Sequence, residues 1–262
     1  MIADCFLFND ELDLLELRLM ELGDIVDRFV VVESPYDFQM NPKVSHYLQN
    51  RERFRTWSDK IVRIQADVPA EPHPAIEHTQ RRAIYSGIED LEISDVVMMG
   101  DVDEIPARCV VEALKKNAPS QPMVIRQRLY YYRATNYVGM WNGTVVMARG
   151  LGKIDFQLTR DRRHYMPPFP GDATGWHFSW FGDAEDVERK LGCIDVKRDN
   201  AMYNSQLPDI PEPGDKKAIE RRVALGDDLF GRDKECKTVP ISPGRLQPDA
   251  IKEWLSGKEK YA

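Results

Sequence analysis

The amino-terminal half of the chain alternates short apolar runs with longer segments of helical periodicity, and this pattern most constrains the fold. Strands are predicted at residues 2–8, 28–34, 60–66 and 96–99, and the last of these is a run of four apolar residues. Leucines recur at helical spacing within 10–26, with Asp10 as the expected N-cap, and a second helix is predicted at 75–91. Such alternation predicts an α/β fold whose largely parallel sheet is covered by helices on both faces.

The pattern changes after residue 120, where two long strands are predicted at 123–133 and 144–149. The Trp-Asn-Gly-Thr segment at 141–144 is typical of a hairpin turn between them. An aromatic segment at 174–182 then precedes a predicted helix at 183–192. These elements extend the sheet, so we expect one mixed, Rossmann-like sheet flanked by helices.

The last 60 residues differ in composition from the rest of the chain, because they hold many Pro and Gly residues with short helical pieces. We therefore expect residues 1–200 to form the main domain. Residues 201–262 are expected to be a C-terminal appendage packed on that same domain, not an independent one.

Composition excludes several classes of protein. The net charge is −7 and the charges are dispersed, which argues against general nucleic-acid binding because phosphate neutralisation needs clustered Lys and Arg. No apolar run approaches the roughly 18 residues of a membrane span, and the amino terminus does not resemble a signal peptide. The four cysteines are scattered and fit neither zinc-ligand spacing nor a disulfide framework. A cytoplasmic location is the expectation, unless the chain is a trimmed form of a longer protein.

Three carboxylates crowd into four residues directly after the fourth predicted strand, as Asp101, Asp103 and Glu104. Like charges this close repel, and a divalent cation bound by their oxygens removes the conflict. Asp101 and Asp103 project to the same side of an extended segment, so both can reach one Mg²⁺ or Mn²⁺ ion. The alternative is a solvated turn that caps the next helix, whose first turn is expected to contain Pro106.

Four stretches of the chain together resemble glycosyltransferase family 17. They are ELDLLELRLMELGDIVDRFVVVES at 11–34, DVVMMGDVDEIPAR at 95–108, GWHFSW at 175–180 and, more weakly, RRHYMPPF at 162–169. The resemblance implies a GT-A-type glycosyltransferase fold, a metal-held diphosphate and inversion at the anomeric carbon. It also implies UDP-N-acetylglucosamine as the donor and a glycan hydroxyl as the acceptor. Family members that act on N-glycans work in the Golgi lumen, which is the location expected if the chain is trimmed.

The resemblance implies roles for the acids and for the histidine of the aromatic stretch. Asp103 is expected to bind the metal directly, and Asp101 to bind the metal or the ribose. Glu104 is expected to support these residues or to cap the helix. His177 is either a metal or substrate ligand or a core residue, and both interpretations stay open.

The loops after the first two predicted strands are expected to face the nucleotide. Asn9 and Glu11 follow the first strand, although helix capping is an equal alternative for Glu11, and Glu33 ends the second. Arg81 and Arg82 lie on the helix before the acidic strand, and a guanidinium there can bind the diphosphate. Adjacent helical residues point in different directions, so we expect one of them, Arg81, in the site.

Further candidates come from the aromatic segment and the helix behind it. Trp176 and Trp180 are either core residues or surfaces on which a sugar ring stacks. An inverting transfer needs a base for the acceptor hydroxyl, and Glu185 is the expected one, with Asp186 as the fallback. Asp183 also belongs to this acidic group, but N-capping explains it best.

Two other functions remain open at this stage. In a phosphohydrolase, Asp101 would be the nucleophile and Asp103 the acid and base. Such enzymes place this acidic pair after the first strand, whereas three predicted strands precede it here. The third possibility is a non-catalytic relative that binds glycans or metals.

Overall fold

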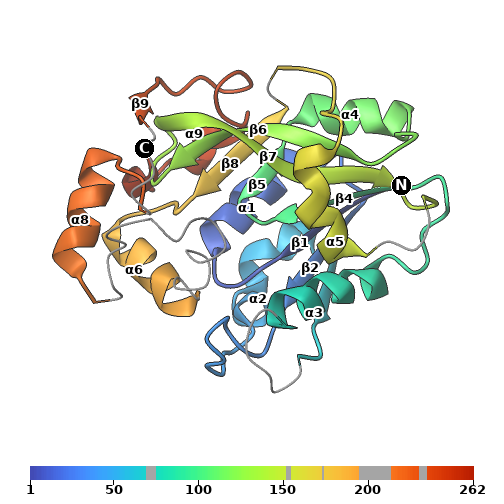
Figure 1. Cartoon of the computed structure of the whole chain (residues 1–262), viewed down its shortest axis with the longest axis horizontal. Coiled ribbons are helices and arrows are strands. Elements are labelled where there is room, and N and C mark those ends of the chain that lie inside the picture. Colours follow the sequence, from blue (N-terminus) through green and yellow to red (C-terminus); the bar gives the residue numbers. More distant parts are fainter. Residues whose placement is uncertain (69–74, 152–154, 173, 195–213, 230–234) are drawn as a thin grey trace. The chain divides into compact units, whose positions relative to one another are not determined.

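The computed structural model describes residues 1–68, 75–151, 155–172, 174–194, 214–229 and 235–262 (Figure 1). The chain forms two compact units, which are described one at a time. The first comprises residues 1–127 and 140–177, and the second residues 128–139 and 178–262. The predicted domain division at residue 200 lies outside the described residues and stays a prediction.

The first part of the chain alternates strands and helices as the sequence predicts. The elements up to the acidic cluster are β1 (Ile2–Leu7), α1 (Leu12–Leu22), β2 (Arg28–Glu33), α2 (His46–Gln49), η1 (Arg51–Trp57), β3 (Ile61–Gln65), α3 (Ala75–Ala83), η2 (Ile84–Gly87) and β4 (Val96–Asp101). All four predicted strands are therefore present.

The remaining elements are mostly strands followed by helices. They are β5 (Glu104–Pro106), α4 (Arg108–Lys116), β6 (Met123–Tyr131), β7 (Asn136–Ala148), α5 (Phe156–Asp161), η3 (Arg162–Tyr165), β8 (Gly175–Ser179), α6 (Ala184–Cys193), α8 (Lys216–Leu225), β9 (Lys237–Thr238), α9 (Ile251–Trp254) and η4 (Glu259–Tyr261). Within the described ranges, no helix has both the length and the apolar character needed to cross a lipid bilayer.

Strand pairing in the described residues forms one mixed sheet. Its order is β3-β2-β1-β4-β7-β6-β8-β5, and β9 pairs with β7. The first four strands in this order are parallel, whereas β7 is antiparallel to β4. The predicted α/β class, with a single mixed sheet flanked by helices, is therefore confirmed.

Helices cover both faces of the parallel part of the sheet. On one face, Ala3 and Cys5 of β1 belong to a buried cluster with Ile76 of α3 and Phe156 of α5. On the other face, α1 covers the alternate β1 side chains, and its Arg18 contacts Asp4 and the ring of Phe6. Two covered faces explain why the β1, β2 and β4 sequences are apolar runs without alternation.

The expected hairpin turn at 141–144 is wrong, because this segment lies inside the long strand β7. The chain turns instead at 132–135, where Tyr132 has a φ of 63°. Gly143 lies against the side chain of Gln127 and does not form a turn. A Cβ at this position would lie 1.6 Å from Oε1 of Gln127.

Two expected helix starts are also wrong. Helix α1 begins at Leu12, and its N-cap is Glu11 instead of Asp10. Pro106 ends the short strand β5, and α4 begins two residues later at Arg108. Pairing with β8 holds Pro106 extended, so tertiary contacts override the local preference of proline for a helix start.

The second unit is organised around three consecutive tyrosines at the end of β6 and in the following turn. The hydroxyl of Tyr131 donates to Asp228 at 2.6 Å, and that of Tyr132 donates to the carbonyl of Asp227 at 2.7 Å. Tyr130 donates to the carbonyl of Leu246. These bonds tie the carboxy-terminal residues to the strand.

We predict that Gly175→Ala destabilises the fold by about 1–3 kcal/mol, because overpacking forces backbone shifts. The added Cβ would lie 2.5 Å from the carbonyl oxygen of Ile105, within the β5–β8 pair. Gly192→Ala is the control, because nothing lies within 4 Å of its Cβ and alanine favours the helix. Urea denaturation of both variants measures the difference, and equal stability of the two would contradict the β5–β8 pairing.

Candidate functional site

The acidic cluster lies at the carboxyl end of β4, next to the carboxyl end of β1 in the sheet. The order β3-β2-β1-β4 is that of a doubly wound sheet, in which ligands bind beyond this edge. The three acids occupy different environments. The side chain of Asp101 is 37% exposed, that of Asp103 10% and that of Glu104 0%. The three carboxylates therefore differ in their access to solvent and to a ligand.

Glu104 is buried because its neighbours leave room for its carboxylate. Gly100 has no side chain there, and a Cβ would lie 2.9 Å from Oε2 of Glu104 and 2.7 Å from Oγ1 of Thr144. Both Glu104 oxygens accept bonds from the guanidinium of Arg160, and Oε1 also accepts a bond of 2.7 Å from Nε1 of Trp141. A buried charge is tolerated when it is paired and hydrogen-bonded in this way.

Asp101 is held between two arginines. Arg160 of α5 donates to its Oδ2 at 2.7 Å, and Arg81 of α3 donates to its Oδ1 at 2.9 Å. Arg81 also bonds Glu77 one turn earlier on α3. Loss of hydration alone would raise the pKa of Asp101, but the charges of Arg160 and Arg81 outweigh it and hold this pKa well below its usual range.

Asp103 meets His177 through strand pairing. Glu104 of β5 lies opposite His177 of β8, and this register brings Nε2 of His177 to 3.6 Å from Oδ1 of Asp103. Nδ1 of His177 is buried and has no hydrogen-bond partner among the described residues. The described part of the chain contains no group of three or more His, Cys, Asp or Glu side chains arranged to hold a metal ion.

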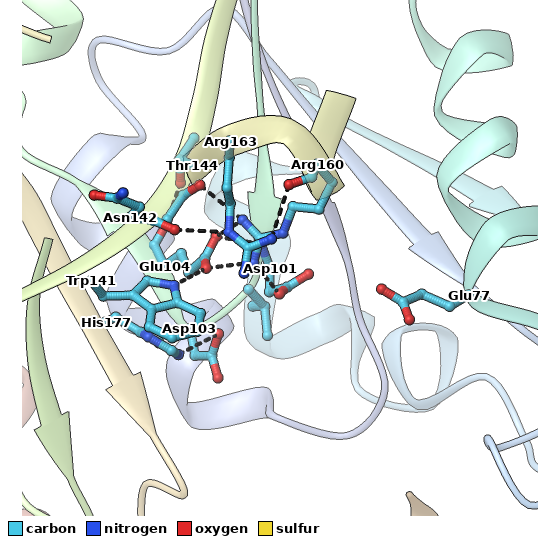
Figure 2. A network of polar contacts seen from close by, with 12 residues as sticks. Glu77, Asp101, Asp103, Glu104, Trp141, Asn142, Thr144, Arg160, Arg163 and His177 are labelled. Carbon is cyan, nitrogen blue, oxygen red and sulfur yellow. Dashed lines mark hydrogen bonds and ion pairs between the residues drawn. The ribbon is translucent and has the colours of Figure 1, made fainter. Parts of the chain in front are cut away.

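Trp141 of β7 contacts both the buried Glu104 and the imidazole of His177 (Figure 2). Figure 2 shows its ring between Glu104 and the His177–Asp103 pair. The ring centroid lies 5.0 Å from that of His177, and the guanidinium carbon of Arg163 lies 5.3 Å from it on the ring face. Arg163 is itself fixed by bonds to the carbonyls of Asn142 and Arg160.

Sequence reasoning missed Arg160, Arg163 and Trp141. Because a turn was expected at 141–144, Trp141 was not predicted to lie on a strand beside the acids. The two arginines are three residues apart on α5 and η3, just before and within the weakest of the four family-like stretches. Their spacing on one helical face was the available signal.

The residues expected near the nucleotide differ in their surroundings and in their hydrogen-bond partners. Glu11 accepts bonds from the backbone amides of Asn9 and Asp10, so the three form a compact turn after β1. Arg82 is exposed, whereas Arg81 reaches Asp101.

Glu33 is enclosed by its own neighbours. Its side chain is 1% exposed and accepts bonds from Arg63 at 2.7 Å and from the amide of Tyr47 at 3.2 Å. It also bonds the hydroxyl of Ser45, the N-cap of α2. These contacts give Glu33 a structural role in fixing the segment after β2.

The two tryptophans of the aromatic segment are buried. Trp176 is 4% exposed and pairs with Ile105 across the β5–β8 ladder. In the second unit Trp180 is 6% exposed, and the ammonium of Lys190 lies 5.8 Å from its ring centroid. These positions favour the core interpretation of both residues.

The acids before and within α6 belong to the second unit. Asp183 is the N-cap and forms a reciprocal capping box with Asp186. Asp186 also pairs with Lys260 and Arg189, and although burial raises its pKa, these cations lower it overall. Glu185 takes no part in the capping box, and its side chain is 78% exposed.

Comparison with known proteins establishes the family. Residues 1–231 match the model of glycosyltransferase family 17. The chain belongs to glycosyltransferase family 17. The resemblance carried by the four sequence stretches is thereby confirmed.

Relatives within this family are distant and longer. Human beta-1,4-mannosyl-glycoprotein 4-beta-N-acetylglucosaminyltransferase is 28% identical over 221 residues, which cover 70% of this chain and 41% of the human one. The rat protein of the same name is 28% identical over 70% of this chain and 40% of its own length. The chain thus spans about two fifths of the length of the curated relatives it matches. Among solved structures, HddC from Yersinia pseudotuberculosis matches 68% of this chain and 88% of its own, with 13% identity and a TM-score of 0.37.

We predict that Asp101→Asn lowers the free energy of unfolding at neutral pH by about 1–2 kcal/mol, a value reduced for the partial exposure of this side chain. A carboxylate whose pKa is lowered by folding stabilises the fold above its unfolded pKa of about 3.9, and this stabilisation is lost as the pH falls. The difference between wild type and variant should therefore shrink from pH 7 to pH 3 in urea titrations without added metal. A difference that stays constant would contradict the ion pairs of Asp101.

Proposed function

We propose that the chain is a metal-dependent, inverting glycosyltransferase of GT-A type that transfers N-acetylglucosamine from UDP-N-acetylglucosamine to a glycan hydroxyl. The observation that carries the proposal is the Asp103–His177 pair at the carboxyl edge of the sheet, beside an acid that two arginines already neutralise. Such an edge is where doubly wound sheets bind nucleotides. Family membership supplies the class of reaction.

A divalent cation, Mn²⁺ or Mg²⁺, fits this pair. Asp103 and His177 would hold it directly. Asp101, whose two oxygens already accept bonds from arginines, would contribute through a bound water. Such ions are commonly bound through one or two protein groups and completed by substrate phosphates, so a set of three protein ligands is not required. When bound, the cation neutralises the charge that builds on the departing nucleotide.

Arg81 is proposed to bind the donor diphosphate. Its Nη2 bonds Asp101 and Glu77, whereas its Nη1 is buried and has no hydrogen-bond partner among the described residues. An unpaired buried donor is costly unless a ligand completes it. A phosphate oxygen is a suitable acceptor, because guanidinium and phosphate geometries match.

The nucleoside is proposed to lie against the turn after β1, formed by Asn9 and Glu11. This turn follows Leu7, which pairs with Asp101 in the ladder between β1 and β4. The order of the strands changes direction between β1 and β4, and nucleotides bind at such points. Glu33 would contribute by holding the segment after β2, since its oxygens bond Arg63, Ser45 and Tyr47.

Glu185 is proposed as the base that takes the proton of the acceptor hydroxyl. Of the three acids at the start of α6, Asp183 and Asp186 form the capping box, and Glu185 does not. Its exposed carboxylate can accept a proton without disrupting the helix.

A cytoplasmic location and a glycan acceptor are also part of this proposal. A cytoplasmic enzyme does not meet mature N-glycans, so the acceptor would differ from the mannosyl glycoprotein in the names of the relatives. The phosphohydrolase alternative is less well supported. It requires Asp101 as a nucleophile, yet both oxygens of this carboxylate are bonded to arginines.

The first test incubates the protein with UDP-sugars and Mn²⁺ and measures the release of UDP. Wild type is expected to release UDP slowly from UDP-N-acetylglucosamine, because water can replace the acceptor. Asp103→Ala is expected to abolish this release and the metal-dependent part of UDP binding, because it removes the main carboxylate ligand of the cation.

The control for this test is Asp90→Asn, whose side chain lies in an exposed pair with Arg28. This variant also removes one carboxylate and is expected to release UDP at the wild-type rate. Phosphate release from a generic phosphoester, without release of UDP, would support the hydrolase instead. No turnover of either substrate would favour a binding protein.

The second test concerns the base. Glu185→Gln keeps the shape of the side chain but removes its basicity, so kcat should fall by about 10²–10⁴-fold while donor affinity and metal dependence stay nearly unchanged. Asp183→Asn should act through the helix cap instead, at a cost of about 0.5–2 kcal/mol of stability. Near-normal turnover of Glu185→Gln beside an inactive Asp186→Asn would move the base to Asp186. Normal turnover in all three variants would exclude this helix as its source.

A further inference from the structure

Arg18 of α1 is a buried arginine that the site chemistry described above does not use. Its side chain is 0% exposed, and it donates to both carboxylate oxygens of Asp4, at 2.6 and 2.7 Å. Its Nη1 donates to the backbone carbonyls of Asp101, Val102 and Glu104, at 3.0, 3.1 and 2.8 Å. Three carbonyls within the four-residue acidic segment therefore converge on one guanidinium.

The charge pair alone does not explain why this arginine is there. A buried ion pair is weak evidence for stability, because apolar residues of similar volume often replace it without loss. The planar guanidinium offers what an apolar side chain cannot, namely several N–H donors in fixed directions. Nε and Nη2 bond Asp4, and Nη1 reaches the backbone of residues 101–104.

We propose that Arg18 is a positioning residue that fixes the conformation of residues 101–104, and through it the placement of Asp103 beside His177. Asp4 holds the guanidinium in its direction, and the guanidinium holds the carbonyls of the segment. The inference rests on the proposed function for its ligands, since the affinity for Mn²⁺ and UDP follows from the placement of Asp103. The ordering of the segment itself does not depend on that function.

Two variants test the proposal. Arg18→Lys keeps a positive charge near Asp4 but loses the planar fork. The double variant with Asp4→Leu and Arg18→Met removes both buried charges and keeps an apolar core, so it remains informative where the single variant folds poorly. Leu19→Ala is the matched control, because Leu19 is fully buried on the same helix and its truncation lowers the melting temperature without removing the guanidinium.

The first measurement is hydrogen exchange of backbone amides. Both Arg18 variants should lose protection at least tenfold in peptides that cover residues 100–105, beyond any change in peptides from β2. Leu19→Ala should show no such selective loss. Equal protection of residues 100–105 in wild type and in the double variant would overturn the proposal.

The second measurement is the binding of Mn²⁺ with UDP by calorimetry, below the melting temperature of each variant. The double variant should bind at least tenfold more weakly than wild type, and Leu19→Ala within about twofold. Wild-type affinity in the double variant would overturn the proposal. If wild type itself binds neither probe, the proposed function fails, and hydrogen exchange then decides the role of Arg18 by itself.

Discussion

Charge compensation at the end of β4 is the constraint on which the site depends. Asp101 and Glu104 lie close together, and Glu104 is fully buried, so both need cations of the protein itself. Arg160 serves both acids, and Arg81 serves Asp101. Two further features serve this arrangement. Gly100 leaves room for the carboxylate of Glu104, and strand β7 carries Trp141, which donates to it.

The same arrangement separates the roles of the three acids. Asp101 and Glu104 share Arg160, and Asp103 lies beside the imidazole of His177. In the proposed function Asp103 is the main protein carboxylate for a cation because His177, a second possible ligand, is next to it. Internal ion pairing therefore accounts for two of the crowded acids, Asp101 and Glu104. The sequence alone predicted a cation at Asp101 and Asp103 and a supporting or capping role for Glu104.

Much of the fold could be predicted from local pattern. Strands β1, β2 and β4 are apolar runs because both faces of the sheet are covered there, and such runs are visible in the sequence. The acids were also visible, as neighbours in the chain. Arg160 and Trp141 could not be assigned to the acids, because their partner Glu104 lies far away in sequence. Arg18 did leave a signal, as a charge among the leucines of α1.

Because Arg160 pairs with both Asp101 and Glu104, the order in which substitutions at these positions are tolerated is constrained. A chain that first loses the positive charge at position 160 is left with a buried Glu104 that has no cationic partner. A chain that first loses Glu104 keeps a buried guanidinium with fewer acceptors. The first intermediate is disfavoured by about 3–5 kcal/mol, the usual cost of breaking a buried pair. The second is disfavoured by less, because Arg160 keeps its bonds to Asp101 and to the carbonyl of Gly143. Positions 104 and 160 are therefore expected to covary, and an alignment of relatives would record that coupling as paired substitutions.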